Sequence, residues 1–65
     1  MKLRELLAVF DPGTRVAIDY NDLNLFPYKV ADLVEDTVFY DLVKDKEVTE
    51  VWSSIVYNAI VIKVE

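Results

Sequence analysis

Three aspartates close to one predicted strand are the residues of this chain whose type and spacing best fit catalysis. Asp11, Asp19 and Asp22 flank or end the segment 15–20. Carboxylate oxygens are common ligands of Mg²⁺, and a hydrated ion held by them could assist the cleavage of a phosphodiester bond. Aspartate is equally common in turns and at exposed strand positions, where it has no chemical task. Asp11, Asp19 and Asp22 are therefore candidate catalytic residues with a simple structural alternative.

Other kinds of active site are excluded by composition. The chain contains no histidine and no cysteine, which rules out Ser–His and Cys–His nucleophiles, disulfides, and imidazole or thiolate metal sites. Gly13 is the single glycine, so a glycine-rich phosphate loop is excluded as well. The hydroxyls of Ser53 and Ser54 have no evident base to activate them. We expect no cofactor and no dedicated metal site, and a role in binding rather than in catalysis.

The whole net charge of the protein lies in residues 32–50. This segment holds seven acidic residues and two lysines, which accounts for the formal charge of −5. Asp32 and Glu35 have the spacing of helix-capping residues, and we expect them to serve a helix end. The other acids could face a basic protein, such as a nucleic-acid-binding nuclease, or could simply be solvated. The predicted partner-facing residues are Asp36, Asp41, Asp45, Glu47 and Glu50.

Aromatic residues are frequent, but their surroundings do not favour nucleic acid as a partner. Bases stack on aromatic rings in single-strand binders, where Lys and Arg lie between the rings. Here Tyr28 and Lys29 are the only close pair of this kind. We therefore expect the rings to pack in the core or in an interface, with Trp52 as the interface candidate. Direct DNA binding is the less favoured interpretation.

The first half of the chain predicts one helix and two strands. Leucines and a phenylalanine in 3–10 recur at helical spacing, and Pro12 ends the helix. Residues 15–20 alternate between apolar and polar side chains, the pattern of a half-buried strand. Residues 25–31 can return as a second strand. Because Pro27 has no N–H group, this strand should lie at an edge of the sheet.

The segment 32–46 carries two conflicting signals. Its apolar residues keep helical spacing, and Asp32 and Glu35 fit a capping box, which together favour a helix. Within it, 37–43 contains a run of β-branched and aromatic residues that is typical of a strand. We predict a helix and keep the strand as the alternative for 37–43.

The last segment predicts a β-hairpin, with strands over 47–56 and 59–64 and a turn at 57–58. The order of elements is then α-β-β-α-β-β in a single domain, 1–65. We predict an α+β fold with a small four-stranded antiparallel sheet, an N-terminal helix and a short middle helix.

The face of this sheet opposite the helices is unusually apolar. It would carry Ala17, Leu25 and Val61, together with either Trp52 or the pair Val51 and Ile55. Exposed apolar area of this kind usually marks an interface. A chain of 65 residues that is 54% hydrophobic also buries too small a core to be very stable alone. We expect a homo-oligomer whose interface includes Trp52, Val61 and Leu25.

Targeting signals are absent from the sequence as given. The opening residues Met1 to Glu5 lack the apolar run of a signal peptide, and no stretch approaches the ~18 apolar residues of a membrane span. We expect a cytoplasmic protein of a bacterial host that has no membrane partner.

Four segments resemble short phage and prophage proteins of gut Firmicutes type. They are KLRELLAVFDPGTRVAIDY, YKVADL, KEVTEVWSS and AIVIKVE. The resemblance covers most of the chain, and it implies an opening helix, a turn before a strand, a short middle element and a closing strand pair. Small anti-CRISPR proteins that inhibit Cas9 are among phage proteins of this size and acidity. Some bind the nuclease as acidic mimics of nucleic acid, and one sheet-forming type is associated with nicking supercoiled DNA.

The sequence thus leads to one expected function and two alternatives. The expected function is a phage or prophage accessory protein that binds as an oligomeric β-sheet module and inhibits a host defence such as CRISPR-Cas. The first alternative is metal-dependent nicking of supercoiled DNA by Asp11, Asp19 or Asp22. The second is a structural assembly subunit without a host target.

Overall fold

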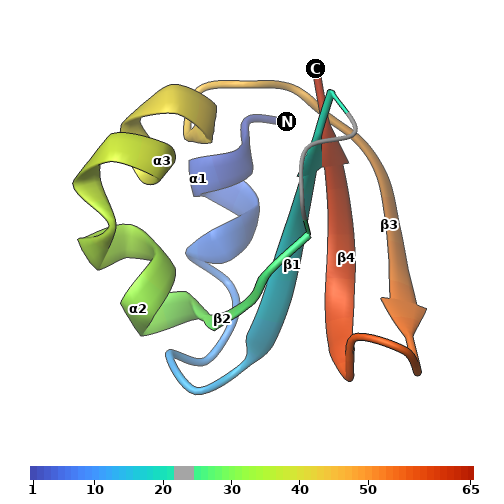
Figure 1. Ribbon diagram of the computed structural model, residues 1–65. Coiled ribbons are helices and arrows are strands. Elements are labelled where there is room, and N and C mark those ends of the chain that lie inside the picture. The colour runs from blue at the N-terminus through green and yellow to red at the C-terminus, as the bar shows by residue number, and fades with distance from the viewer. Residues whose placement is uncertain (22–24) are drawn as a thin grey trace.

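Two antiparallel strand pairs form one sheet, and three short helices cover one of its faces in the part of the chain that the structure describes (Figure 1). The computed structural model describes residues 1–21 and 25–65. The elements in chain order are α1 (Leu3–Leu7), β1 (Arg15–Tyr20), β2 (Pro27–Lys29), α2 (Val30–Glu35), α3 (Thr37–Val43), β3 (Val48–Ser54) and β4 (Ala59–Val64). The α+β class is confirmed, with both the N-terminal helix and helical structure in the middle of the chain.

The sheet is mixed, so the prediction of a purely antiparallel sheet is wrong. The strand order is β2-β1-β4-β3, and the central strands β1 and β4 are parallel, with Val16 opposite Ile60. The connection through α2 and α3 explains this. It carries the chain from the end of β2 back to the opposite end of the sheet, so β3 runs in the direction of β2 and β4 in the direction of β1 (Figure 1). Parallel neighbours require such a crossover.

The helix predicted for 37–43 is present and the alternative strand is wrong, but the middle helix is broken in two. The chain enters α2 at Val30, earlier than predicted, and Asp36 separates α2 from α3. The expected cap by Asp32 and Glu35 is wrong, because α2 begins after Lys29 without a side-chain cap. Asp36 is the capping residue instead. Its carboxylate accepts a hydrogen bond from the Phe39 N–H, which satisfies a free donor at the start of α3.

Strand lengths follow the backbone constraints of each segment. The second strand covers only Pro27–Lys29 and lies at an edge, as its proline predicts. β3 ends at Ser54, and the turn covers residues 55–58 rather than 57–58. Asn58 adopts a left-handed φ of 49°, a conformation that asparagine tolerates better than most residues. No helix in the described ranges is long and apolar enough to cross a membrane.

The core lies between the helices and the covered face of the sheet. The buried cluster consists of Leu3, Leu7, Val16, Ile18, Val30, Leu33, Val43, Ile62 and Val64. Each helix contributes at least one of these side chains, so all three helices are held by apolar burial rather than by their own length.

The opposite face carries a row of apolar residues across all four strands. The register places Pro27, Ala17, Val61 and Trp52 side by side. It also resolves an alternative of the sequence, because Trp52 rather than Val51 shares this face with Val61. Ala17 and Val61 are buried within the single chain, and Trp52 keeps 41% of its surface exposed.

Candidate protein-binding surface

The aspartates considered for catalysis do not come together in the described residues. Asp11 lies in the turn after α1 and Asp19 near the far end of β1. The strand from Arg15 to Asp19 alone spans about 13 Å at ~3.3 Å per residue. Asp22 lies outside the described residues. Within 1–21 and 25–65, no group of three or more acidic residues is placed to hold a metal ion.

The predicted partner-facing acids mostly have partners inside the chain. Asp41 lies 3.1 Å from Lys44, and Asp45 lies 2.9 Å from Arg4. These ion pairs are exposed and individually weak, but they offset the negative charge locally. Asp36 is half-buried by the contacts that join α2, α3 and β2. The segment between α3 and β3 is therefore less negative than its acid content suggests.

Glu47 is held by the start of the chain. The Met1 α-ammonium donates a hydrogen bond of 2.8 Å to its carboxylate. This hydrogen bond and the positive charge lower the pKa of Glu47, and the same contact raises the pKa of the α-ammonium.

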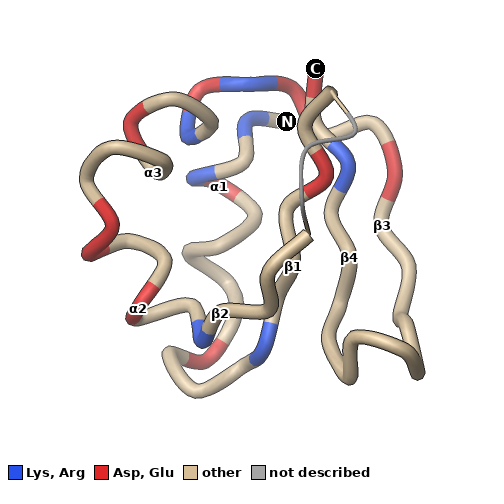
Figure 2. The backbone as a smooth tube through the Cα atoms, in the orientation of Figure 1, with Lys and Arg blue, Asp and Glu red and all other residues tan. Residues whose placement is uncertain are grey.

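The exposed acids without an ion pair in the described part of the chain include Asp32 and Glu35 on α2 and Glu50 on β3. Asp41 on α3 is exposed as well, and Figure 2 shows acidic residues along both helices. We call Asp32, Glu35 and Asp41 the acidic helix surface. Sequence reasoning assigned Asp32 and Glu35 to capping, because the local spacing could not show that Asp36 would be the cap.

Asp36 also accepts a hydrogen bond from a tyrosine. The Tyr28 hydroxyl donates to its second carboxylate oxygen at 3.0 Å, and the Tyr28 ring stacks on Phe39 at 6.3 Å between centroids. Partial burial raises the pKa of Tyr28 above its ordinary value near 10, and the hydrogen bond and charge of Asp36 raise it further.

This contact predicts a pH-dependent contribution of Tyr28 to stability. Because its pKa is raised by folding, the contribution is complete below about pH 10 and disappears as the pH rises through the folded-state pKa. We expect Tyr28→Phe to lower the free energy of unfolding by about 1 kcal/mol near neutral pH. The difference from wild type should shrink above about pH 10 in urea unfolding curves. Tyr57→Phe, in the β3–β4 turn, is the control. A difference that does not change with pH would contradict this role.

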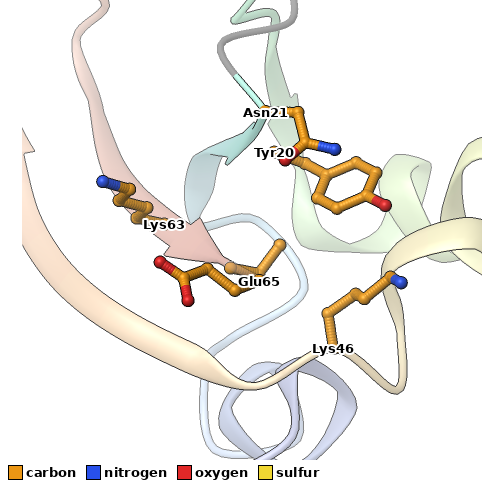
Figure 3. A pocket seen from close by; sticks show the side chains of 6 residues that line it. Tyr20, Asn21, Lys46, Lys63 and Glu65 are labelled. Carbon is orange, nitrogen blue, oxygen red and sulfur yellow. The ribbon is translucent and has the colours of Figure 1, made fainter.

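Among the described residues, hollows lie at both ends of the sheet, and neither of the two named here forms a converging charged site. One of about 460 Å³ is lined by Tyr20, Asn21, Lys46, Lys63, Val64 and Glu65. Lys46 lies over the Tyr20 ring, 5.2 Å from its centroid. The ammonium groups of Lys46 and Lys63 point apart, with Glu65 between them (Figure 3). The other hollow, of about 520 Å³, lies beside the β3–β4 turn, where Arg15 donates to the Asn58 carbonyl.

The outer strand β3 exposes both its backbone edge and apolar side chains. It is the last strand of the sheet, and most of its residues are exposed. Val51 and Trp52 are partly exposed, and Ile55 and Val56 at the turn are 99% and 89% exposed. We call the edge of residues 50–54 with these four side chains the β3 surface. Edge strands of soluble proteins usually carry charges or proline that prevent pairing with another chain. Residues 50–54 contain no proline, and Glu50 is their only charged residue.

One end of β3 is already covered by the start of the chain. Leu3 N–H donates to the Lys46 carbonyl at 3.0 Å, and Val48 N–H donates to the Met1 carbonyl at 2.8 Å. Lys2 forms an antiparallel bridge with Glu47. We call residues 1–3 the N-terminal strap. In the described chain, the open part of the edge therefore begins only after Val48.

The three residues predicted to form an interface differ in how much of each side chain is exposed. Trp52 belongs to the β3 surface, Leu25 is half-buried, and Val61 is 1% exposed and offers no surface to a partner. Sequence reasoning named Ile55 only with Val51, as an alternative to Trp52 on the exposed face, and it did not single out Val56. A signal was present, because 51–62 contains no charged residue in an acidic protein. Figure 2 shows the lower half of the β3–β4 pair free of charge.

No protein-family model, no curated protein and no solved structure matches this chain.

Proposed function

We propose that this protein acts by binding, as a β-sheet module that pairs with another protein chain through the open edge of β3. The observation that carries the proposal is the β3 surface. It combines unpaired backbone groups, an absence of charge over 51–56, and apolar side chains that are exposed in the single chain. Strand addition to an open sheet edge is a recurrent mode of protein recognition, in which backbone hydrogen bonds supply affinity and side chains supply specificity.

The acidic helix surface supports a basic protein as the target of the module. Asp32, Glu35 and Asp41 lie on the helical layer, and the β3 surface, in which Glu50 is the one charged residue, lies at the far edge of the sheet (Figure 2). The two surfaces can be occupied at the same time. Together with the resemblance to small phage proteins, this supports a phage accessory protein that inhibits a host defence nuclease in the bacterial cytoplasm.

Cleavage of plasmid DNA by purified Cas9 tests this function. We expect wild-type protein to reduce cleavage and to lose that effect at high salt, because attraction between exposed charges is screened. Val51→Lys/Ser53→Lys places two positive charges on the open edge. A strand that pairs there would have to meet or cover these charges, which costs binding free energy, so inhibition should weaken by about tenfold or more.

Val9→Lys/Phe26→Lys is the matched control. It makes the same change of charge at exposed apolar sites outside β3, and it should inhibit as well as wild type. If excess wild-type protein leaves both Cas9 cleavage and phage plating on an immune host unchanged, the proposed host-defence function is wrong. Equal inhibition by the β3 variant and the control would exclude the β3 surface.

A further inference from the structure

The open edge of β3 has two fixed limits. At one end the N-terminal strap occupies the edge beside Lys46 to Val48. At the other end the chain leaves the sheet after Ser54 and enters the turn of 55–58. Between these limits lie residues 50–54, where backbone groups that point to the open edge alternate with groups that bond to β4, and Trp52 is the central residue of this stretch.

We propose that the occupant of this edge is a second copy of the chain, paired antiparallel so that a two-fold axis passes beside Trp52. This inference rests on the proposed function, since it names the chain that pairs with β3. In this register Trp52 lies opposite the partner's Trp52, Val51 lies opposite the partner's Ser53, and the sheet continues through both copies. A symmetric dimer requires such self-complementary pairing.

The limits of the edge select this register over its neighbours. If the axis passed beside Val51, the partner's Ser54 would lie opposite Val48, whose N–H already donates to the Met1 carbonyl. If it passed beside Ser53, Glu50 and Val51 would lie opposite the partner's turn and lose their pairs. Only the register centred on Trp52 uses all five residues of the open edge.

The distribution of charge over the molecule also favours a second copy. Two chains of −5 repel each other wherever acidic surfaces meet. The β3 surface is the place where they can approach, because Glu50 is its only charged residue and lies opposite the partner's Ser54 in this register. Like charges directly opposite each other, which destabilise strand pairs, are thereby avoided.

The same register brings exposed apolar groups together. The two Trp52 side chains meet on the face of the sheet opposite the helices, as shown by the pairing of Trp52 with Val61. Ile55 and Val56 extend toward the partner's Thr49 and Met1, and Met1 is itself mostly exposed. Covering these side chains would enlarge the apolar area buried by a chain with a small core of its own.

Cysteine cross-linking of the full chain tests the dimer and its register, since the protein has no cysteine of its own. A mixture of Val51→Cys protein with Ser53→Cys protein should form disulfide-linked heterodimers under mild oxidation, because opposed Cα atoms lie about 5 Å apart. Either variant alone should cross-link much less, since its two cysteines would lie about 8 Å apart, beyond the range of a disulfide. Trp52→Cys alone should cross-link well.

Sedimentation of unmodified protein over a concentration series supplies the second readout. We expect wild type and Val9→Lys/Phe26→Lys to sediment as dimers, and Val51→Lys/Ser53→Lys to require about tenfold higher concentration or more to form them. Monomeric wild type at all concentrations overturns the inference. So does a dimer that Val51→Lys/Ser53→Lys leaves intact, or one with another cross-linking pattern. A monomer that still inhibits Cas9 through β3 overturns the dimer alone and leaves the proposed function standing.

Discussion

Leu33→Ala is expected to lower the free energy of unfolding by about 2–5 kcal/mol. Leu33 is fully buried, and it anchors α2 in the cluster between the helices and the sheet. Replacing a buried leucine with alanine costs about 2–5 kcal/mol, because apolar contact is lost and a cavity remains. At ~0.05–0.15 kcal/mol per residue, the whole chain is stabilised by only about 3–10 kcal/mol. One substitution at this position can therefore remove most of the stability.

Urea unfolding followed by circular dichroism measures this effect. Leu42→Ala is the matched control, since the same side chain is removed from α3 where half of it is exposed, and the expected loss is below about 1 kcal/mol. Similar midpoints for the two variants would show that α2 does not dock on the sheet as described.

Asp36→Ala is the second variant from which we expect a large loss, of about 2 kcal/mol. Asp36 lies between α2 and α3, and its two carboxylate oxygens accept from different elements. One accepts from the Phe39 N–H at 3.2 Å and the other from the Tyr28 hydroxyl at 3.0 Å. The substitution removes the cap of α3 and the link between the helices and β2 in one step.

Two further variants separate this role from a general effect of charge. Asp36→Asn keeps an acceptor for the cap, so it should recover about half of the loss. Asp32→Ala removes an exposed acid from the same segment and should cost much less. The free energy of unfolding from urea titrations compares all three. An equal loss for Asp32→Ala and Asp36→Ala would contradict the bridging role.

The strands of this protein could be predicted better than the way they are assembled. The segments 15–20 and 59–64 alternate clearly between apolar and polar residues, and β1 and β4 have these bounds. The edge position of β2 could also be predicted, because Pro27 has no N–H group to donate to a second neighbouring strand. The parallel pairing of β1 with β4 could not be seen in the same way. This pairing depends on the end of the sheet to which the helical crossover returns the chain. No short sequence pattern specifies that end.

The candidate site shows the same division between local and long-range information. The uncharged run of 51–62 was visible in the sequence, and it marks the β3 surface. The partners of Asp45 and Glu47 were not, because Arg4 and Met1 lie more than half the chain away. Helix formation at Phe39 and Tyr40 also reflects packing against the core, which overrides the preference of aromatic residues for strands.

The parallel pairing at the centre of the sheet has a consequence for how the chain folds. β1 and β2, and likewise β3 and β4, are near neighbours in the chain and can find each other quickly. The seam that joins the two pairs connects Val16 with Ile60, so about two thirds of the chain must close into a loop before it forms. Pairings of such long range slow folding, since entropy is lost before contacts compensate. The speed of folding is then set by the meeting of the first and last strands.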